Sequence, residues 1–143
     1  MAKIAVLGYG TVGSGVVEVL NTNGASIAKR AGDTIEVKSV LDLRDFPGDP
    51  IQDKIVHDYK TIVEDPEVKI VVETMGGVEP AYTFVKAMLE AGKHVTTSNK
   101  ALVAAKGAEL IALANILVYI ILSFGGATED AFYSLPANWQ SID

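Results

Sequence analysis

The chain has 143 residues, of which 49% are hydrophobic and 21% charged, a composition that excludes general disorder and fits one domain with its own core. It contains no cysteine and two histidines, which excludes disulfides and thiolate metal sites and argues against a histidine zinc site. Its formal net charge of -6, with basic residues scattered along the sequence, argues against nucleic-acid binding.

The first elements in chain order are a strand and a helix. Lys3–Leu7 is followed by a glycine and predicts a strand. The apolar run within it is too short for a signal peptide, so we expect a cytoplasmic protein. The next apolar residues fall at i, i+4, i+7 and i+8 and predict one face of a helix. These residues are Val12, Val16, Val19 and Leu20. The helix either ends at residues 21–24 or continues towards Gly32.

Two further strands follow. Ile35–Leu41 alternates between apolar and polar residues and predicts the second strand, whereas residues 44–54 contain prolines and a glycine typical of a loop. Residues 59–65 predict a short helix that stops before Pro66. Val68–Glu73 is an almost continuous apolar run, which is typical of a strand covered on both faces of a sheet.

The alternation of strands and helices continues to residue 114. Pro80 suits the start of a helix that Gly92 ends, Lys93–Thr96 predicts a strand, and Ala101–Ala114 predicts a further helix. Strands that alternate with helices require right-handed crossovers and a parallel sheet. The sequence therefore predicts a single α/β domain with a doubly wound parallel sheet.

The last segment differs in character. Residues 110–127 carry no charge over 18 residues, which is the lower limit for a membrane-spanning helix. Polar and glycine residues within it favour another prediction: a helix end, a turn at Asn115 and a buried strand over 116–123, followed by irregular chain. We therefore expect no membrane partner.

A glycine motif of the form G-x-G-x-x-G spans residues 8–13, between the first predicted strand and helix. Gly8 permits a tight turn, Gly10 lets a pyrophosphate approach the backbone, and Gly13 lets the helix pack close to the strand. The start of the helix offers free N–H groups and a partial positive charge to phosphates. The motif predicts dinucleotide binding; the alternative is a mere glycine turn in a domain of this class.

Two charged residues after the second strand suggest opposite cofactors. Asp42 is placed to accept the ribose 2′-OH of NAD, whereas Arg44 is placed to hold the 2′-phosphate of NADP. Asp42 is also compatible with a simple role as a loop carboxylate. The spacing leaves both NAD and NADP open.

Further candidate residues follow the predicted strands Val68–Glu73 and Lys93–Thr96, at the edge where parallel sheets bind ligands. Gly76 and Gly77 allow the backbone to meet a nicotinamide or its ribose, or they form a turn with a positive φ angle. Residues 97–100 bring Lys100 to the same edge. Its ammonium can polarise a carbonyl during hydride transfer, although a lysine between a strand and a helix is more often a solvated charge.

Residues from Ile4 to about Ala114 resemble the N-terminal, Rossmann-like cofactor domain of homoserine dehydrogenase. The resemblance rests on GYGTVGSGVVEVL (8–20), VVETMGGVE (71–79) and HVTTSNKALV (94–103). It implies reversible reduction of aspartate semialdehyde to homoserine with NADH or NADPH, a step towards threonine, methionine and isoleucine.

The resemblance also implies roles for individual residues. Lys100 corresponds to a lysine that contacts the reacting oxygen and is a candidate for proton transfer, and the Arg44-Asp45 pair supports a role for Arg44 near the adenosine ribose. The residues implied to hold the pyrophosphate are Gly8, Gly10, Thr11, Val12 and Gly13. The residues implied to line the nicotinamide side are Met75, Gly76, Ser98 and Asn99.

Residues 115–143 do not match the family, which suggests a truncation, a shifted reading frame or an altered expressed sequence. We expect residues 1–114 to form the cofactor domain and the family's substrate and dimerisation domain to be absent. The chain is then expected to bind a dinucleotide with little turnover. Its apolar run over 116–122 is either buried as an extra strand or exposed, and an exposed run favours self-association as a homo-oligomer through a sheet edge. Two alternatives are a stand-alone dinucleotide-sensing module and another amino-acid dehydrogenase, such as one acting on aspartate.

Overall fold

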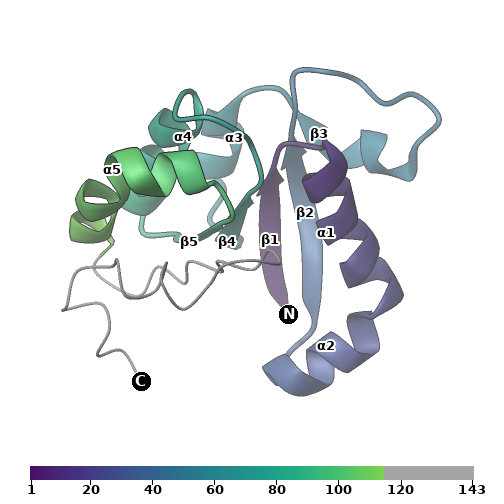
Figure 1. The fold of residues 1–143 in the computed structure, drawn as a ribbon. Helices are drawn as coiled ribbons and strands as arrows, with labels where there is room; N and C mark the ends of the chain where they lie inside the picture. The colour runs from purple at the N-terminus through teal and green to yellow at the C-terminus, as the bar shows by residue number, and fades with distance from the viewer. Residues whose placement is uncertain (115–143) are drawn as a thin grey trace.

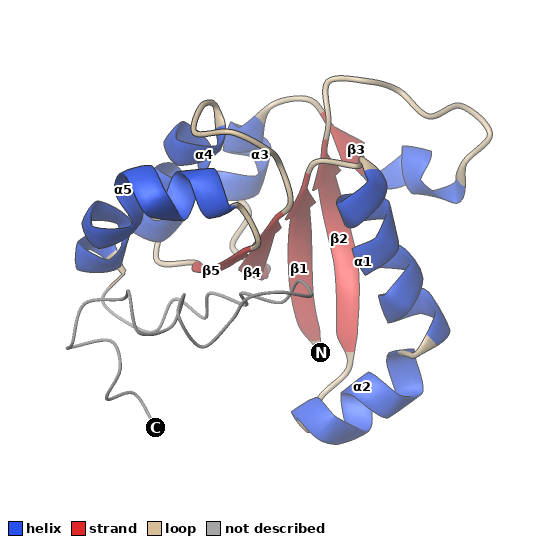
Figure 2. Cartoon of the chain, viewed as in Figure 1, coloured by secondary structure: helices blue, strands red, loops and turns tan. Residues whose placement is uncertain are grey.

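The computed structural model describes residues 1–114, and these form a parallel five-stranded sheet flanked by helices (Figures 1 and 2). The strand predicted over 116–123 lies outside the described residues. The strand order is β3-β2-β1-β4-β5, and every pairing is parallel. The strands are β1 (Ala2–Leu7), β2 (Ile35–Leu41), β3 (Ile55–Val56), β4 (Val68–Glu73) and β5 (His94–Thr97).

Helices cover both faces of the sheet, which confirms the doubly wound class. One apolar cluster joins β1 and β2 to α1 on one face, and a second cluster joins β1 and β4 to α3, α4 and α5 on the other. A short 3-10 helix, η1, adds Ile51 to the first cluster. The helices are α1 (Thr11–Thr22), α2 (Gly24–Ala31), η1 (Pro50–Lys54), α3 (Tyr59–Val63), α4 (Ala81–Glu90) and α5 (Lys100–Leu113).

Most element boundaries agree with the sequence-based predictions. The bounds of β2 and β4 are those predicted, and β1, β5 and α5 differ by one residue at one or both ends. The structure resolves the choice left open after the first helix: α1 ends at Thr22, and α2 then runs to a left-handed Gly32 with φ +76°. The predicted loop over 44–54 contains η1, and β3 was not predicted because a two-residue strand has no periodicity to detect.

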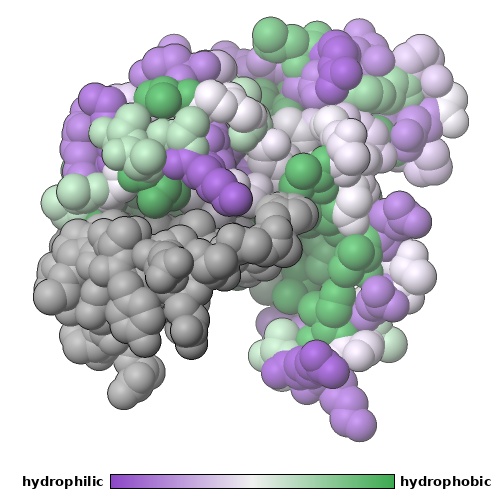
Figure 3. Space-filling view, viewed as in Figure 1, coloured by the Kyte–Doolittle hydropathy of each residue, from purple (hydrophilic) through white to green (hydrophobic). Residues whose placement is uncertain are grey.

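The prediction that β4 is covered on both faces is confirmed on only one. Val71 is fully buried on the α4 side, whereas Ile70 and Val72 are half-buried and line a groove of about 650 Å³ beside α1. Val12 and Val19 border this groove and are 39% and 50% exposed, and Figure 3 shows hydrophobic side chains gathered there. Within residues 1–114, no helix covers this part of the sheet, and most of the side chains that line the groove are apolar.

The strand order fixes where a ligand site can form. From β1 the chain moves outward to β2 and β3, and then returns to the other side of β1 for β4 and β5. The connections after β1 and β4 therefore diverge, which leaves a crevice at the carboxyl ends of these neighbouring strands. Among the described helices, none is long and apolar enough to cross a membrane.

Candidate functional site

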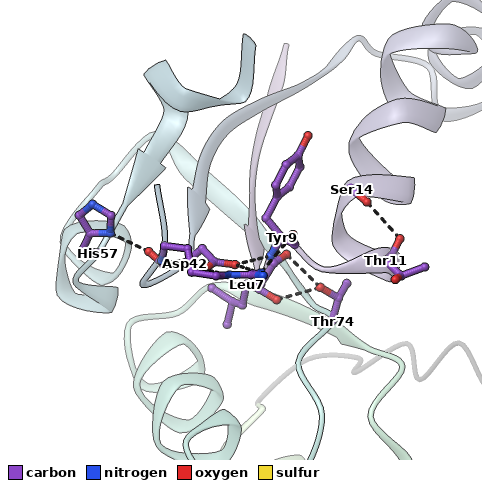
Figure 4. A network of polar contacts seen from close by, with 9 residues as sticks. Leu7, Tyr9, Thr11, Ser14, Asp42, His57 and Thr74 are labelled. Carbon is purple, nitrogen blue, oxygen red and sulfur yellow. Dashed lines mark hydrogen bonds and ion pairs between the residues drawn. The ribbon is translucent and has the colours of Figure 1, made fainter. Parts of the chain in front are cut away.

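The predicted site segments meet at the carboxyl edge of the sheet. The glycine loop follows β1, Asp42 follows β2, residues 74–77 follow β4, and residues 98–100 follow β5. Because β2, β1, β4 and β5 are neighbours in this order, the residues predicted to face the adenosine lie on one side of the glycine loop and those predicted to face the nicotinamide lie on the other. Figure 4 shows the first of these groups around the start of α1.

The glycine loop has the geometry that its sequence predicts at two positions. Gly8 has φ +95°, which an L side chain rarely adopts, and this confirms the tight turn. A Cβ added at Gly13 would lie 1.9 Å from the Gly8 carbonyl oxygen, so only glycine allows α1 to approach the strand this closely. The predicted structural roles of Gly8 and Gly13 are therefore confirmed.

The start of α1 is open at Gly10. A Cβ added there would have no atom within 4 Å, and no side chain caps the helix. Thr11 and Val12 in the first turn are exposed. The first N–H groups of the 12-residue helix are thus available to an anion, together with the positive end of its dipole.

Thr74 joins the two loops of the crevice and was not singled out from the sequence. Its hydroxyl lies 2.9 Å from the Leu7 carbonyl oxygen and 3.2 Å from that of Gly8, and its backbone N–H also donates to Leu7 (Figure 4). The loop after β4 is therefore fastened to the glycine loop. A polar β-branched residue directly after a central strand was the available signal.

Asp42 and Arg44 form one unit rather than two separate candidates. The Arg44 guanidinium contacts both carboxylate oxygens, at 3.0 and 2.9 Å, and the Tyr9 N–H donates to the same carboxylate at 3.0 Å. The Asp42 side chain is 9% exposed, while that of Arg44 is 64% exposed. The hydrogen bonds from Arg44 hold the pKa of the Asp42 carboxyl well below its usual range.

His57, which follows β3, is a neighbour of this pair. Its Nδ1 lies 2.7 Å from the Asp42 carbonyl oxygen, and its Nε2 lies 3.0 Å from the Asp45 carboxylate. It holds the loop after β2 in place from the outside (Figure 4). Within residues 1–114, no group of three His, Asp or Glu side chains is arranged to hold a metal ion.

Among the residues predicted to lie on the nicotinamide side, some are exposed and others support the loops. Gly76 and Lys100 are exposed, and Lys100 is the first residue of α5. Asn99 is buried and caps α5 by accepting the Leu102 N–H at 3.1 Å, while its amide donates to the Gly77 carbonyl at 2.6 Å. Gly77 has φ +77°, so the turn alternative accounts for this glycine.

Three more residues complete this side of the crevice. Ser98 is half-buried and lines the groove, and Met75 is half-buried with its Cγ beside Gly8. Glu73, which sequence reasoning did not select, is fully buried and accepts the Met75 N–H at 2.5 Å. Burial raises the pKa of the Glu73 carboxyl. A charged residue at the end of an apolar strand was the signal for it.

The sheet order, the glycine turn and the open start of α1 together define a dinucleotide-binding domain of the Rossmann type. More particularly, the chain belongs to the homoserine dehydrogenase family: the model described as "Homoserine dehydrogenase, NAD binding domain" matches residues 8–119. This confirms the resemblance found in the sequence. It also favours this family over a stand-alone sensing module or another amino-acid dehydrogenase.

Individual relatives agree with the family. The chain is 42% identical over 113 residues to the homoserine dehydrogenase of Pseudomonas aeruginosa, a match that covers 78% of this chain and 26% of that protein. Over 129 residues it is 39% identical to the Corynebacterium glutamicum enzyme, covering 87% of this chain and 29% of the relative.

Solved structures show the same fold. The Staphylococcus aureus homoserine dehydrogenase at pH 7.5 has a TM-score of 0.77 and 33% identity, covering 87% of this chain and 33% of that one. The Thiobacillus denitrificans enzyme has a TM-score of 0.73 and 38% identity, covering 79% and 27%. The chain thus spans about a quarter to a third of the length of the relatives it matches.

Proposed function

We propose that this chain binds NAD or NADP in the crevice between β1 and β4, as the cofactor domain of a homoserine dehydrogenase. The observation that carries the proposal is the space at Gly10, beside an uncapped helix start and a turn that only glycine permits. A pyrophosphate needs this combination, because its oxygens accept hydrogen bonds from backbone N–H groups that no side chain obstructs.

The proposed binding residues follow the order of the strands. The pyrophosphate lies against Gly8, Gly10, Thr11, Val12 and Gly13. The adenosine ribose lies against Asp42 and Arg44 at the end of β2. The nicotinamide lies on the β4 and β5 side, where Met75, Gly76, Ser98 and Asn99 form or support the wall.

Lys100 is the proposed catalytic residue. When bound, the nicotinamide supplies the hydride that converts the aldehyde carbonyl of aspartate semialdehyde to the hydroxyl of homoserine. Lys100 is exposed at the same edge of the sheet, so its ammonium is available to polarise the carbonyl oxygen and provide the proton that the new hydroxyl requires. In the reverse direction the neutral amine takes this proton back.

Activity of the 143-residue chain by itself is a separate matter. The resemblance implies that further groups for homoserine lie in a part of the relatives that this chain does not cover. We therefore propose dinucleotide binding with little turnover, because differential binding of the transition state needs those groups. Measurable oxidation of homoserine by the purified chain would contradict this.

Self-association and location remain predictions. The apolar run over 116–122 still favours a homo-oligomer, and sedimentation at increasing protein concentration tests it; a mass that stays monomeric would refute it. The cytoplasmic location likewise remains a prediction from the sequence.

The first experiment is a parallel titration of the chain with NADH and NADPH, followed by calorimetry and nicotinamide fluorescence. Saturable binding of either one supports the proposed function, and the ratio of the two affinities defines the cofactor preference. ADP-ribose serves as a third ligand because it carries the pyrophosphate and both riboses without the nicotinamide. A folded chain that binds none of the three would refute the proposal.

A further inference from the structure

We propose that Glu73 is a positioning residue for the nicotinamide half of the dinucleotide, an inference that rests on the proposed function. Its buried carboxyl ties the loop after β4 to the loop after β5, and these loops form the nicotinamide side of the crevice. It contacts neither the glycine loop nor the adenosine-side pair in any interaction that the structure records.

The carboxyl links the two loops directly. Glu73 is the last residue of β4 and is 0% exposed. One of its oxygens accepts the Met75 N–H at 2.5 Å, from its own loop, and the other accepts the hydroxyl of Thr97, the last residue of β5. Thr97 in turn accepts the Asn99 N–H at 3.0 Å, which extends the connection to the residue that caps α5.

A second hydrogen bond joins the same two loops. The Asn99 side-chain amide donates to the Gly77 carbonyl at 2.6 Å, so the loop after β4 is held at Met75 and again at Gly77. Gly76 lies between these two anchored residues, and both Gly76 and Gly77 are exposed. Two consecutive glycines have many backbone conformations available. If they are held in place before the ligand binds, less conformational entropy is lost on binding.

The burial of this carboxyl has no explanation in packing alone. None of the ion pairs recorded within residues 1–114 includes Glu73, and burial without an opposite charge disfavours the ionised form. An apolar side chain at this position would avoid the free-energy penalty of desolvating a carboxyl group. A costly buried polar group at the ligand edge of a sheet indicates a role in shaping the site.

The position of Glu73 in the sheet predicts a selective effect. β4 and β5 lie on one side of β1, whereas Asp42 and Arg44 follow β2 on the other side. Loosening the Glu73 connections therefore changes the loops that face the nicotinamide and leaves the adenosine side intact. A purely structural residue would instead affect both halves of the ligand alike.

The experiment measures the affinities of NADH and ADP by calorimetry, together with urea unfolding, for the complete 143-residue chain and its variants. We expect Glu73→Ala to weaken NADH binding about tenfold, as for a lost buried hydrogen bond, while the affinity for ADP, which lacks the nicotinamide and its ribose, is unchanged. Glu73→Gln should retain most of the NADH affinity, because its carbonyl oxygen still accepts from Met75 and its amide donates to the Thr97 oxygen.

One further variant controls for stability, and another provides a second test of the Glu73 connection. Val71→Ala removes a fully buried side chain from the same strand, and it should lower the unfolding free energy without altering the ratio of the two affinities. Thr97→Val replaces with a methyl group the hydroxyl that donates to Glu73 and accepts the Asn99 N–H. If Glu73→Ala fails to fold, Thr97→Val provides the test, with the same selective loss for NADH.

The outcomes distinguish the two proposals. A wild-type chain that binds neither ligand refutes the proposed function and the positioning role with it. A wild-type chain that binds both, with variants that lose the two ligands equally or lose neither, leaves the proposed function standing and overturns the role of Glu73. Selective loss of NADH binding, recovered in Glu73→Gln, supports it.

Discussion

Alanine substitutions in the glycine loop should separate its structural role from its binding role. A Cβ at Gly13 would lie 1.9 Å from the Gly8 carbonyl oxygen and 2.9 Å from the Thr74 hydroxyl oxygen. The first distance is roughly 1.5 Å shorter than van der Waals contact, and the obstacle is backbone, which cannot rotate away. Either α1 moves outward or the turn at Gly8 opens. We expect Gly13→Ala to cost about 3 kcal/mol of unfolding free energy, the upper end for overpacking.

Urea and thermal unfolding followed by circular dichroism measure this loss, which corresponds to a Tm about 12 °C lower. Gly15→Ala, on the same helix, is the matched control, because a Cβ at Gly15 would have no atom within 4 Å. It should be neutral or gain up to about 1 kcal/mol of helix propensity. Gly10→Ala should unfold like the wild type and yet bind dinucleotide at least about tenfold more weakly, because its methyl group obstructs the pyrophosphate. Wild-type stability in Gly13→Ala would refute the close approach of α1 to β1.

Two further predictions concern charge. Arg44→Ala should weaken NADPH more than NADH in the parallel titration, and an equal effect on both would contradict a role at the 2′-phosphate. The second concerns Asp65, which lies 2.5 Å from the Lys38 ammonium, and the hydrogen bond from Lys38 lowers the pKa of the Asp65 carboxyl. The stability that this ion pair contributes is therefore present above the unfolded pKa of about 3.9 and is lost as the pH falls through the lower pKa of the folded state. Asp65→Asn should therefore be less stable than the wild type at pH 7, and the difference in unfolding midpoint should vanish in acid; a constant difference would refute the pairing.

The extent to which the fold follows from the sequence depends on the length of the local pattern. Residues 35–41 and 68–73 carry several alternating or continuous apolar positions, and their strands have the predicted bounds. β3 is paired through only two residues, so the sheet rather than the local sequence decides it. The break between α1 and α2 has the same origin, because the apolar period alone is compatible with a stop or a continuation at Asn23.

In the site, residues with local roles were predictable and residues with distant partners were not. The turn at Gly8 and the close contact at Gly13 follow from the absence of a side chain within one short motif. Thr74 acquires its role from Leu7, 67 positions away, and Glu73 from Thr97, 24 positions away. Only the strand order brings these partners together, so no spacing in the sequence points to them.

The conflict between Asp42 and Arg44 shows why spacing alone left the cofactor open. Considered separately, the carboxylate suits NAD and the guanidinium suits NADP. In the structure the guanidinium spans both carboxylate oxygens, so a ribose 2′-OH must share Asp42 with Arg44, while a 2′-phosphate must draw Arg44 away from it. Because Arg44 is 64% exposed, solvent weakens its ion pair, and we expect a phosphate to be able to replace Asp42 as its partner. With the adenosine ribose placed at this pair as proposed, we expect cofactor preference to depend on a competition within the pair rather than on either residue alone.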